Sequence, residues 1–236
     1  MTPFLGSRRP DFRAGRHALT YDDYWKQRGY SISKKLSERE IIIRDLIQPK
    51  ESVLIIGCGT SLLPIALQEK GCEVTVSDIA PGAVKLFTDK DIPGFVLDLE
   101  NIVEGTISEN YDSIIASEVL EHIRNPEQAI EKFSKHTKRF IISIPNSAFY
   151  RYRIHLMFAG RFFVQWANHP AEHLRYWSHI DFLEWLSAMD LKVQKVIPSN
   201  GLSCKGLCTF MKDFMPNLFG HQIVYVCTVS AQSSDK

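Results

Sequence analysis

The chain has 236 residues, enough for one well-buried core, and its 28 Lys and Arg against 27 Asp and Glu leave a net charge of +1. That balance gives no sign of a nucleic-acid or membrane-surface partner, and no apolar run reaches the roughly 20 residues that span a bilayer. Five irregularly spaced cysteines argue against a disulfide framework, and the first residues lack the apolar segment of a secretory signal, so we expect a cytoplasmic protein.

The first part of the chain, residues 1–48, is expected to be an irregular arm followed by a helical segment. Apolar residues at helical spacing over residues 20–48 indicate the helix, and Pro49 ends it. From residue 49 to residue 236 strands and helices alternate. Short apolar or β-branched runs predict strands at residues 52–56, 73–77, 95–97, 111–116, 139–144, 192–197 and 222–229, and helical patterns lie at 61–70, 81–90, 126–135 and 179–189.

This alternation predicts an α/β fold with a mostly parallel seven-stranded sheet and helices on both faces. The last two strands have no helix-length apolar pattern between them, so we expect them to pair antiparallel. Residues 146–177 interrupt the alternation and are rich in aromatic residues and Arg, which could form a pocket or simply pack on the core. Ligands of such sheets bind at the carboxyl ends of the strands, so functional residues should lie in the loops after the first four strands.

The loop after the first strand, Gly57-Cys58-Gly59, is the first candidate site. Glycines permit positive φ and have no Cβ, so a flat ligand can lie against their backbone. The Gly-Lys-Ser/Thr of a P-loop is absent, and Leu62 stands where a dinucleotide fingerprint has its third glycine. Taken alone, the motif is also compatible with a plain tight turn.

Acidic residues after the next two strands strengthen this site. Asp78 ends the second strand, where a carboxylate can accept hydrogen bonds from both hydroxyls of a ribose. Asp98, after the third strand, could accept from an adenine amino group. Each has a simpler alternative: an Asx turn for Asp78 and a solvated loop acid for Asp98. Three such features behind three consecutive strands nevertheless indicate a nucleoside site.

These features resemble the successive motifs of class I methyltransferases that use S-adenosylmethionine (SAM). The resemblance runs through residues 53–59, Asp78, Asp98 and residues 111–122, and covers roughly residues 50–145 in order. It implies a Rossmann-like methyltransferase fold with an antiparallel C-terminal strand and a lid insertion at about residues 146–177, SAM as cofactor and S-adenosylhomocysteine (SAH) as product. The cofactor-binding residues that it implies are Gly57, Cys58, Gly59, Asp78, Ile79, Asp98, Leu99 and Ser117.

Further segments narrow the resemblance to the MetW (methionine biosynthesis) branch. They are residues 143–146, 160–166 and 169–177, with Asp22, Tyr24 and Trp25 near the start. MetW-like proteins are linked with homoserine acyltransferase, so two functions are implied. One is an enzyme that methylates a small-molecule acceptor. The other is a non-catalytic or weakly catalytic SAM-binding partner of a homoserine acyltransferase.

Two positions depart from the pattern of the resembled superfamily. Ile55 stands where an Asp or Glu usually helps to place the charged end of the cofactor, and Ser61 stands where a third glycine is usual. Loss of a charge-assisted hydrogen bond costs about 1.5–3 kcal/mol, roughly 10- to 100-fold in affinity. We therefore expect SAM binding that persists but is weaker than is typical.

The segment after the fourth strand contains the candidate catalytic residues. His122 is the best single candidate for a general base, with Glu121 beside it, and a histidine that only packs below the site is the alternative. Glu118, Glu121 and His122 are spaced so that on a helix they would share one face and could hold a divalent cation. No fourth ligand is identifiable, although His155, His169 and His173 are available, so we expect no resident metal and keep this set as an alternative.

Overall fold

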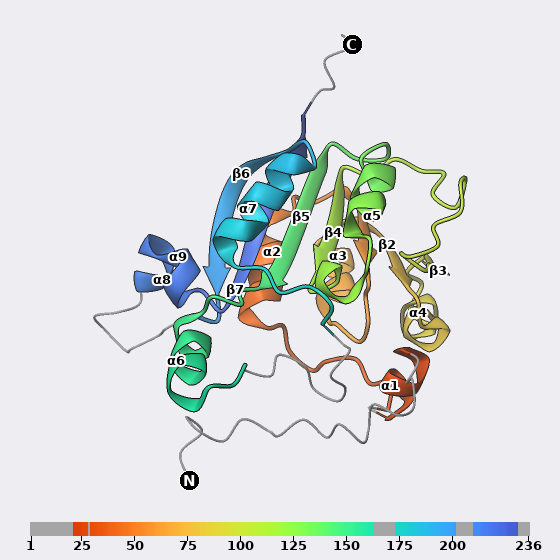
Figure 1. Ribbon diagram of the computed structural model, residues 1–236. Helices are drawn as coiled ribbons and strands as arrows, with labels where there is room; N and C mark the ends of the chain where they lie inside the picture. Colours follow the sequence, from red (N-terminus) through yellow and green to blue (C-terminus); the bar gives the residue numbers. More distant parts are fainter. Residues whose placement is uncertain (1–20, 28, 163–172, 202–209, 231–236) are drawn as a thin grey trace.

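The computed structural model describes residues 21–27, 29–162, 173–201 and 210–230. Its centre is a seven-stranded sheet in the order β3-β2-β1-β4-β5-β7-β6 (Figure 1). The strands are β1 (Ser52–Ile56), β2 (Glu73–Asp78), β3 (Gly94–Val96), β4 (Ser113–Ser117), β5 (Arg139–Pro145), β6 (Leu191–Ser199) and β7 (Gln222–Val229). Strands β1 to β5 pair in parallel, and β7 is antiparallel to both β5 and β6. The expected sheet with its antiparallel C-terminal strand is confirmed.

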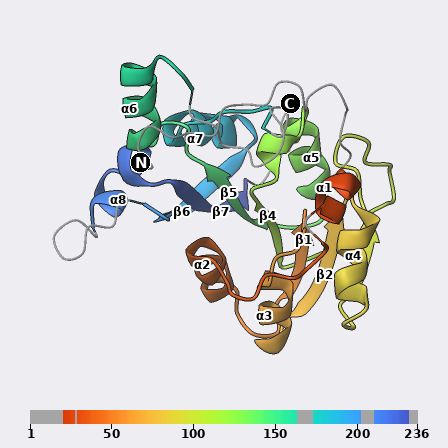
Figure 2. The same ribbon diagram turned by 90° about the horizontal axis from the view of Figure 1, so that it is seen from below.

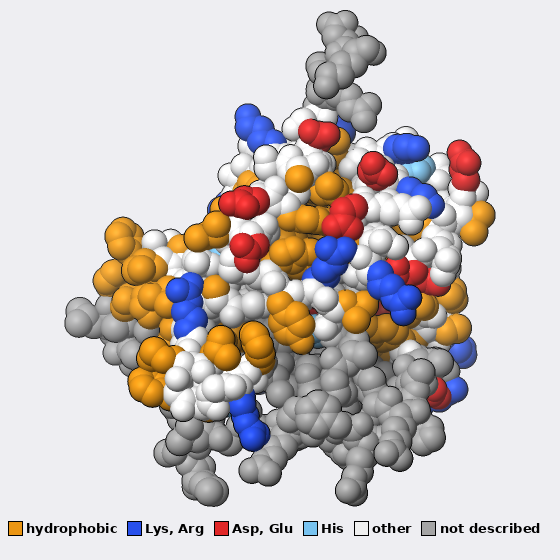
Figure 3. All heavy atoms as spheres, viewed as in Figure 1, with side chains coloured by type: hydrophobic (Ala, Val, Ile, Leu, Met, Phe, Trp, Pro, Cys, Tyr) orange, Lys and Arg blue, Asp and Glu red, His pale blue; other side chains and the backbone are white. Residues whose placement is uncertain are grey.

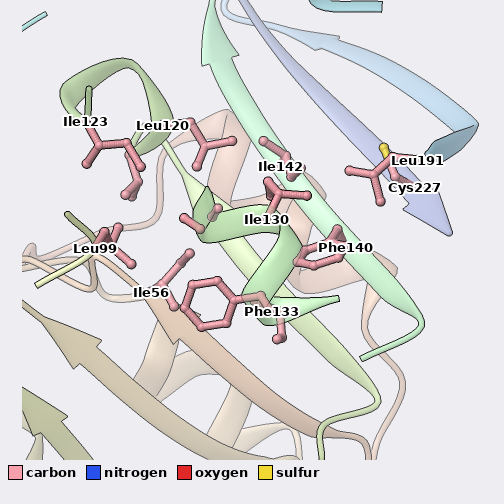
Figure 4. Packing of buried hydrophobic residues seen from close by; sticks show 14 of the residues in the cluster. Ile56, Leu99, Leu120, Ile123, Ile130, Phe133, Phe140, Ile142, Leu191 and Cys227 are labelled. Atoms are coloured by element: carbon pink, nitrogen blue, oxygen red, sulfur yellow. The ribbon is translucent and has the colours of Figure 1, made fainter. Parts of the chain in front are cut away.

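Helices cover both faces of the sheet, because the central strands are apolar on both sides. One face packs against α2 (Glu38–Leu46), α3 (Leu63–Glu69) and α4 (Pro81–Thr88), and the other against α5 (Pro126–Phe133) and α7 (His179–Ala188) (Figure 2). On the face that α5 and α7 cover, Ile130 and Phe133 of α5 lie close to Phe140 and Ile142 of β5 (Figure 4). This packing fixes β1, β4 and β5 as a rigid platform.

The N-terminal segment differs from the expectation of one helix over residues 20–48. It forms α1 (Tyr21–Gln27) and, after an irregular stretch, α2. Gly29 has a φ of 79°, which ends the first helical segment. Ser37 and Glu40 form a capping box that begins α2. Apolar residues recur at helical spacing through the segment, but Gly29 and the capping box divide it into two helices.

Residues 146–177, predicted as a lid, contain α6 (Tyr150–Ala159) and a segment without regular structure that leads into α7. Residues 163–172 of this stretch, and the predicted arm before residue 21, lie outside the described residues. Two short helices, α8 (Met211–Phe214) and α9 (Pro216–Phe219), connect to β7, and apolar side chains gather on the surface over them (Figure 3). Among the described helices, none is long and apolar enough to cross a membrane.

Candidate functional site

A cavity of about 1150 Å³ lies at the carboxyl ends of β3, β2, β1 and β4. Its wall contains all eight residues that the sequence named for cofactor binding: Gly57, Cys58, Gly59, Asp78, Ile79, Asp98, Leu99 and Ser117. The strand order puts them in a row, from Asp98 beyond β3, past Asp78 and the glycine loop, to Ser117 on β4. Pockets for single small ligands measure about 300–1,000 Å³, so this cavity is large enough for one such ligand.

The glycine loop after β1 is shaped by close packing as well as by backbone conformation. Gly57 and Gly59 have φ values of 66° and 50°. A Cβ on Gly57 would lie 2.5 Å from Cγ2 of Val119, and one on Gly59 would lie 2.7 Å from Cζ2 of Trp25. Neither position accepts a side chain without a shift of its neighbour. Trp25 of α1 therefore lies over the loop, a contact that the sequence did not indicate.

Cys58, between the two glycines, is buried and its N–H donates to the carbonyl of Ser77 at 3.0 Å. Burial raises the pKa of its thiol, and the nearby Asp78 carboxylate raises it further. The thiol therefore stays protonated, which excludes a nucleophilic thiolate at this position. Cys58 contributes backbone and shape to the cavity wall.

Asp78 braces the glycine loop from the end of β2. Its Oδ2 accepts a hydrogen bond from the N–H of Gly59 at 2.8 Å, and its Oδ1 accepts from the N–H of Ala80 at 2.9 Å. The second bond is the Asx turn that the sequence offered as the alternative. Burial raises the pKa of Asp78, while the backbone hydrogen bonds oppose that rise. The N–H of Ile79 also interacts with this carboxylate, and the lone-pair capacity that remains can accept a ligand hydroxyl.

The end of the row beyond β3 combines one acid with two apolar walls. Asp98 is half-buried and accepts from the N–H of Glu100 at 2.9 Å and from Nδ2 of Asn101 at 2.7 Å. Leu99 is buried in the core beside it, and Ile79 is 42% exposed on the cavity wall. A flat apolar ring with a polar edge matches this combination.

Glu118 follows β4 in a strained conformation. Its φ is 57°, in the left-handed region that residues with a Cβ rarely adopt. Its Oε2 accepts from Nε2 of Gln222 at 2.6 Å and lies 3.3 Å from Nη1 of Arg39. Its Oε1 accepts from Oγ of Ser143 at 3.2 Å. These contacts join β4, β5, β7 and α2 at one corner of the cavity.

The predicted helical face shared by Glu118, Glu121 and His122 is wrong. A 3-10 turn spans only Leu120–His122, and the positive φ of Glu118 directs that carboxylate toward α2 and β7. Instead, Glu121, His122 and His173 come together, and each offers one ligand atom within 4.8 Å of the others. The alternative metal site named from the sequence therefore does not include Glu118, and His173 of the segment 146–177 takes its place.

The two candidate catalytic residues occupy different depths. His122 lines the cavity with its side chain 21% exposed, whereas Glu121 is 1% exposed and lies beneath the wall, 3.9 Å from Nε2 of His122. Neither carboxylate oxygen of Glu121 has a hydrogen-bond partner among the described residues. Burial raises the pKa of Glu121, and the charge of Glu118 adds to that rise. Burial and the neighbouring His122 lower the pKa of His173 to about 4, so that ring is neutral at pH 7.

The cavity also has walls that the sequence analysis missed. Tyr21 and Trp25 of α1 line it, and so do Arg39 and Glu40 of α2 and Leu174 of the lid segment. The N–H of Leu174 donates to the carbonyl of Glu121 at 2.8 Å. The serine and glutamate of the α2 capping box stand at a recognisable spacing, so the helix start could have been predicted. The approach of α2 to the glycine loop is a tertiary contact, which no local sequence pattern predicts.

Comparison with known proteins addresses the family and the fold. A family model described as methionine biosynthesis protein MetW matches residues 38–227. A curated relative, malonyl-[acyl-carrier protein] O-methyltransferase of Anoxybacillus flavithermus, is 28% identical over 189 residues. That alignment covers 75% of this chain and 67% of the relative.

Two solved structures resemble the whole fold. One is a TehB-like SAM-dependent methyltransferase from Corynebacterium glutamicum, with a TM-score of 0.55 and 16% identity over 92% of this chain and 98% of the other. The second is the magnesium protoporphyrin IX methyltransferase of Synechocystis with bound SAH, with a TM-score of 0.52 and 14% identity over 96% and 91% of the two chains. At these identities the likeness shows the fold, which is the Rossmann-like fold of class I methyltransferases.

Proposed function

The chain belongs to the MetW family, and on that premise we propose that it is a SAM-dependent methyltransferase that acts on a small-molecule acceptor. SAM supplies a methyl group that is activated by a positively charged sulfur. One observation carries the proposal: Asp98, Asp78, the glycine loop and Ser117 lie in a row along one cavity, across four adjacent strand ends. A nucleoside with an extended amino-acid arm has the same linear shape.

The described residues fit this cofactor. Asp78 can accept the ribose hydroxyls on its remaining lone pairs, and Asp98 can accept from the adenine amino group. Ile79 and Leu99 provide apolar contact for the base. The glycines at 57 and 59 let Val119 and Trp25 pack closely against the loop that forms this part of the cavity wall. The ligands named in similar proteins, SAM and SAH, support the same assignment.

We assign His122 as the group that accepts the proton of an oxygen or nitrogen acceptor. Its side chain lies on the wall of the same cavity as the cofactor-binding row, where an acceptor could approach the transferable methyl group. The acceptor atom attacks the methyl carbon, and its proton passes to the imidazole. Glu121 is buried beneath His122, so it acts as a positioning residue and does not contact the acceptor.

Native mass spectrometry of the purified protein tests the cofactor assignment. We expect added SAM or SAH to remain bound to the wild type, and the complex to be lost in Asp78→Ala. Undiminished binding by Asp78→Ala would show that the ribose does not lie at this carboxylate. An equal loss of all adenine nucleosides and of thermal stability would instead indicate a collapsed glycine loop, which Asp78→Asn disturbs less because it keeps one of the two backbone hydrogen bonds.

The family description favours one second function, in methionine biosynthesis. In this alternative the chain binds SAM without turning it over and serves a homoserine acyltransferase as a partner. Replacement of the usual acid by Ile55 and of the usual glycine by Ser61 agrees with such a role. Stable co-elution with a homoserine acyltransferase, together with absence of SAH formation, would support the partner and contradict the enzyme.

A further inference from the structure

We propose that Glu40 supplies the carboxylate that the β1 motif lacks and binds the ammonium group at the amino-acid end of SAM. The inference rests on the proposed SAM site and names a residue outside the recognised motifs. Its starting point is Ile55, which is 3% exposed and packs in the core with α2 and α3. Position 55 therefore gives no charge to the cavity.

The row of nucleoside-binding residues sets the direction of the cofactor. Asp98 and Asp78 mark its base and ribose over β3 and β2, so its amino-acid end extends across β1 toward β4. There the first turn of α2 forms the cavity wall with Arg39 and Glu40. The ion pair of Arg39 with Glu118, at 3.3 Å, holds α2 against the end of β4. Glu40 is thus at the far end of the row from Asp98.

Three hydrogen bonds hold the Glu40 carboxylate at this end. The N–H and Oγ of Ser37 each donate to Oε2 at 2.7 Å, and Oγ of Ser61 donates to Oε1. Oγ of Ser61 also accepts from the N–H of Leu63 at 3.0 Å. Glu40 is 8% exposed, so water screens its charge weakly. Ser61 is therefore the residue that fastens the carboxylate to the glycine loop, which gives the serine a role that a glycine could not perform.

Arg39 provides the complementary charge beside Glu40. Its Nε is buried and has no hydrogen-bond partner within the described residues, while Nη1 pairs with Glu118. A buried donor without a partner is costly, and a ligand carboxylate would satisfy it. One acid and one base on consecutive residues match the ammonium and the carboxylate of a zwitterionic amino acid.

Isothermal titration of Glu40→Gln with SAM, SAH and 5′-methylthioadenosine tests the proposal. The third ligand keeps the adenine, ribose and sulfur but has no amino-acid arm. Glutamine keeps an acceptor for the Ser37 capping box and removes the charge, while its amide group faces Ser61 as a donor in place of an acceptor. We expect the dissociation constants of SAM and SAH to rise by about 10- to 100-fold, with that of methylthioadenosine unchanged. Equal weakening of all three ligands, or unchanged binding of SAM, would overturn the assignment.

Two further variants separate charge from folding. Glu38→Gln is the matched control, because Glu38 lies in the same turn of α2, pairs with Lys212 and is not part of the cavity wall. It should leave all three affinities unchanged. Ser61→Ala keeps the charge of Glu40 but removes the hydrogen bond that Ser61 donates to it. It should weaken the binding of SAM and SAH less than Glu40→Gln does, and leave the binding of methylthioadenosine unchanged. Ser61→Ala that weakens all three ligands equally would contradict the proposal. Wild-type protein that binds none of them would remove the SAM assignment itself.

Discussion

At the scale of single residues, Asp78 does two things with one carboxylate. It braces Gly59 and Ala80 through their N–H groups, and in the proposed complex it also accepts the ribose hydroxyls. Removing the side chain therefore disturbs the loop and the ligand together. Asparagine keeps one acceptor oxygen and the size of the side chain, so it is the better probe of the charge.

The raised pKa of Asp78 predicts how SAM affinity depends on pH. Burial raises this pKa above the ordinary value of 3.8 in the free protein, whereas donors from a ribose favour the ionised form. Binding therefore expels the proton, and affinity falls as the pH falls through the pKa of the free protein. Titration calorimetry across the acid range should show this fall in wild type and lose it in Asp78→Asn. The same fall in both proteins would assign the dependence to another group.

Replacement of His122 tests the proposed proton acceptor. His122→Gln should lower the rate of methyl transfer by about 10²- to 10⁴-fold and leave the dissociation constant of SAM unchanged. Glu121→Gln, at the buried positioning residue, should move the pH–rate profile while turnover persists. A wild-type rate in His122→Gln would reduce the histidine to a packing residue, the alternative that its sequence motif left open.

At the scale of elements, the glycine loop and the turn after β4 are packed as one unit. In Gly57→Ala the added Cβ would meet Val119, and a φ of 66° is strained for alanine. We expect a loss of about 1–3 kcal/mol in the free energy of unfolding, measured by chemical denaturation. Adding Val119→Ala should recover part of it, because the collision is relieved and the backbone strain remains. Strict additivity of the two changes would show that the elements do not interact here.

Two elements also bring Glu121, His122 and His173 together, so the metal question can be tested directly. We expect treatment with a chelator to leave the turnover of SAM unchanged, because His122 acts as a base in this account. Loss of turnover that a divalent cation restores would instead make these three side chains a ligand set. In the presence of the chelator, turnover by His173→Ala that equals turnover by the wild type would agree with a reaction that needs no metal.

Local residue patterns were enough to predict most helices and strands, but not the contacts between residues that are distant in the chain. The strand at residues 222–229 and the helix at residues 179–189 were predicted from local patterns, and the structure has both, as β7 and α7. The break at Gly29 was missed because apolar spacing alone does not register a single left-handed residue. The position of Glu118 was missed for the same reason. The pairing of Glu40 with Ser61 joins residues 21 positions apart, and no periodicity encodes it.

At the scale of the whole molecule, the sheet order decides where the proposed chemistry takes place. Because β1 neighbours both β2 and β4, the loops after these strands meet on one edge, and α1 and α2 close that edge from the N-terminal side. The family match begins at residue 38, with α2, so the α2 part of this wall belongs to the matched region and α1 precedes it. In the proposed complex the cofactor lies against α1, α2 and the loops after β1 to β4, and the acceptor lies beside His122.

Turnover of SAM tests the central claim most directly. Purified protein is incubated with methyl-labelled SAM and small-molecule fractions of a cell extract, and SAH and the labelled product are followed by mass spectrometry. The account predicts that SAH forms with at least one fraction, that the label enters a small molecule, and that Asp78→Asn suppresses both. Tight SAM binding without SAH formation in any fraction, together with co-elution of a homoserine acyltransferase, would contradict the enzyme.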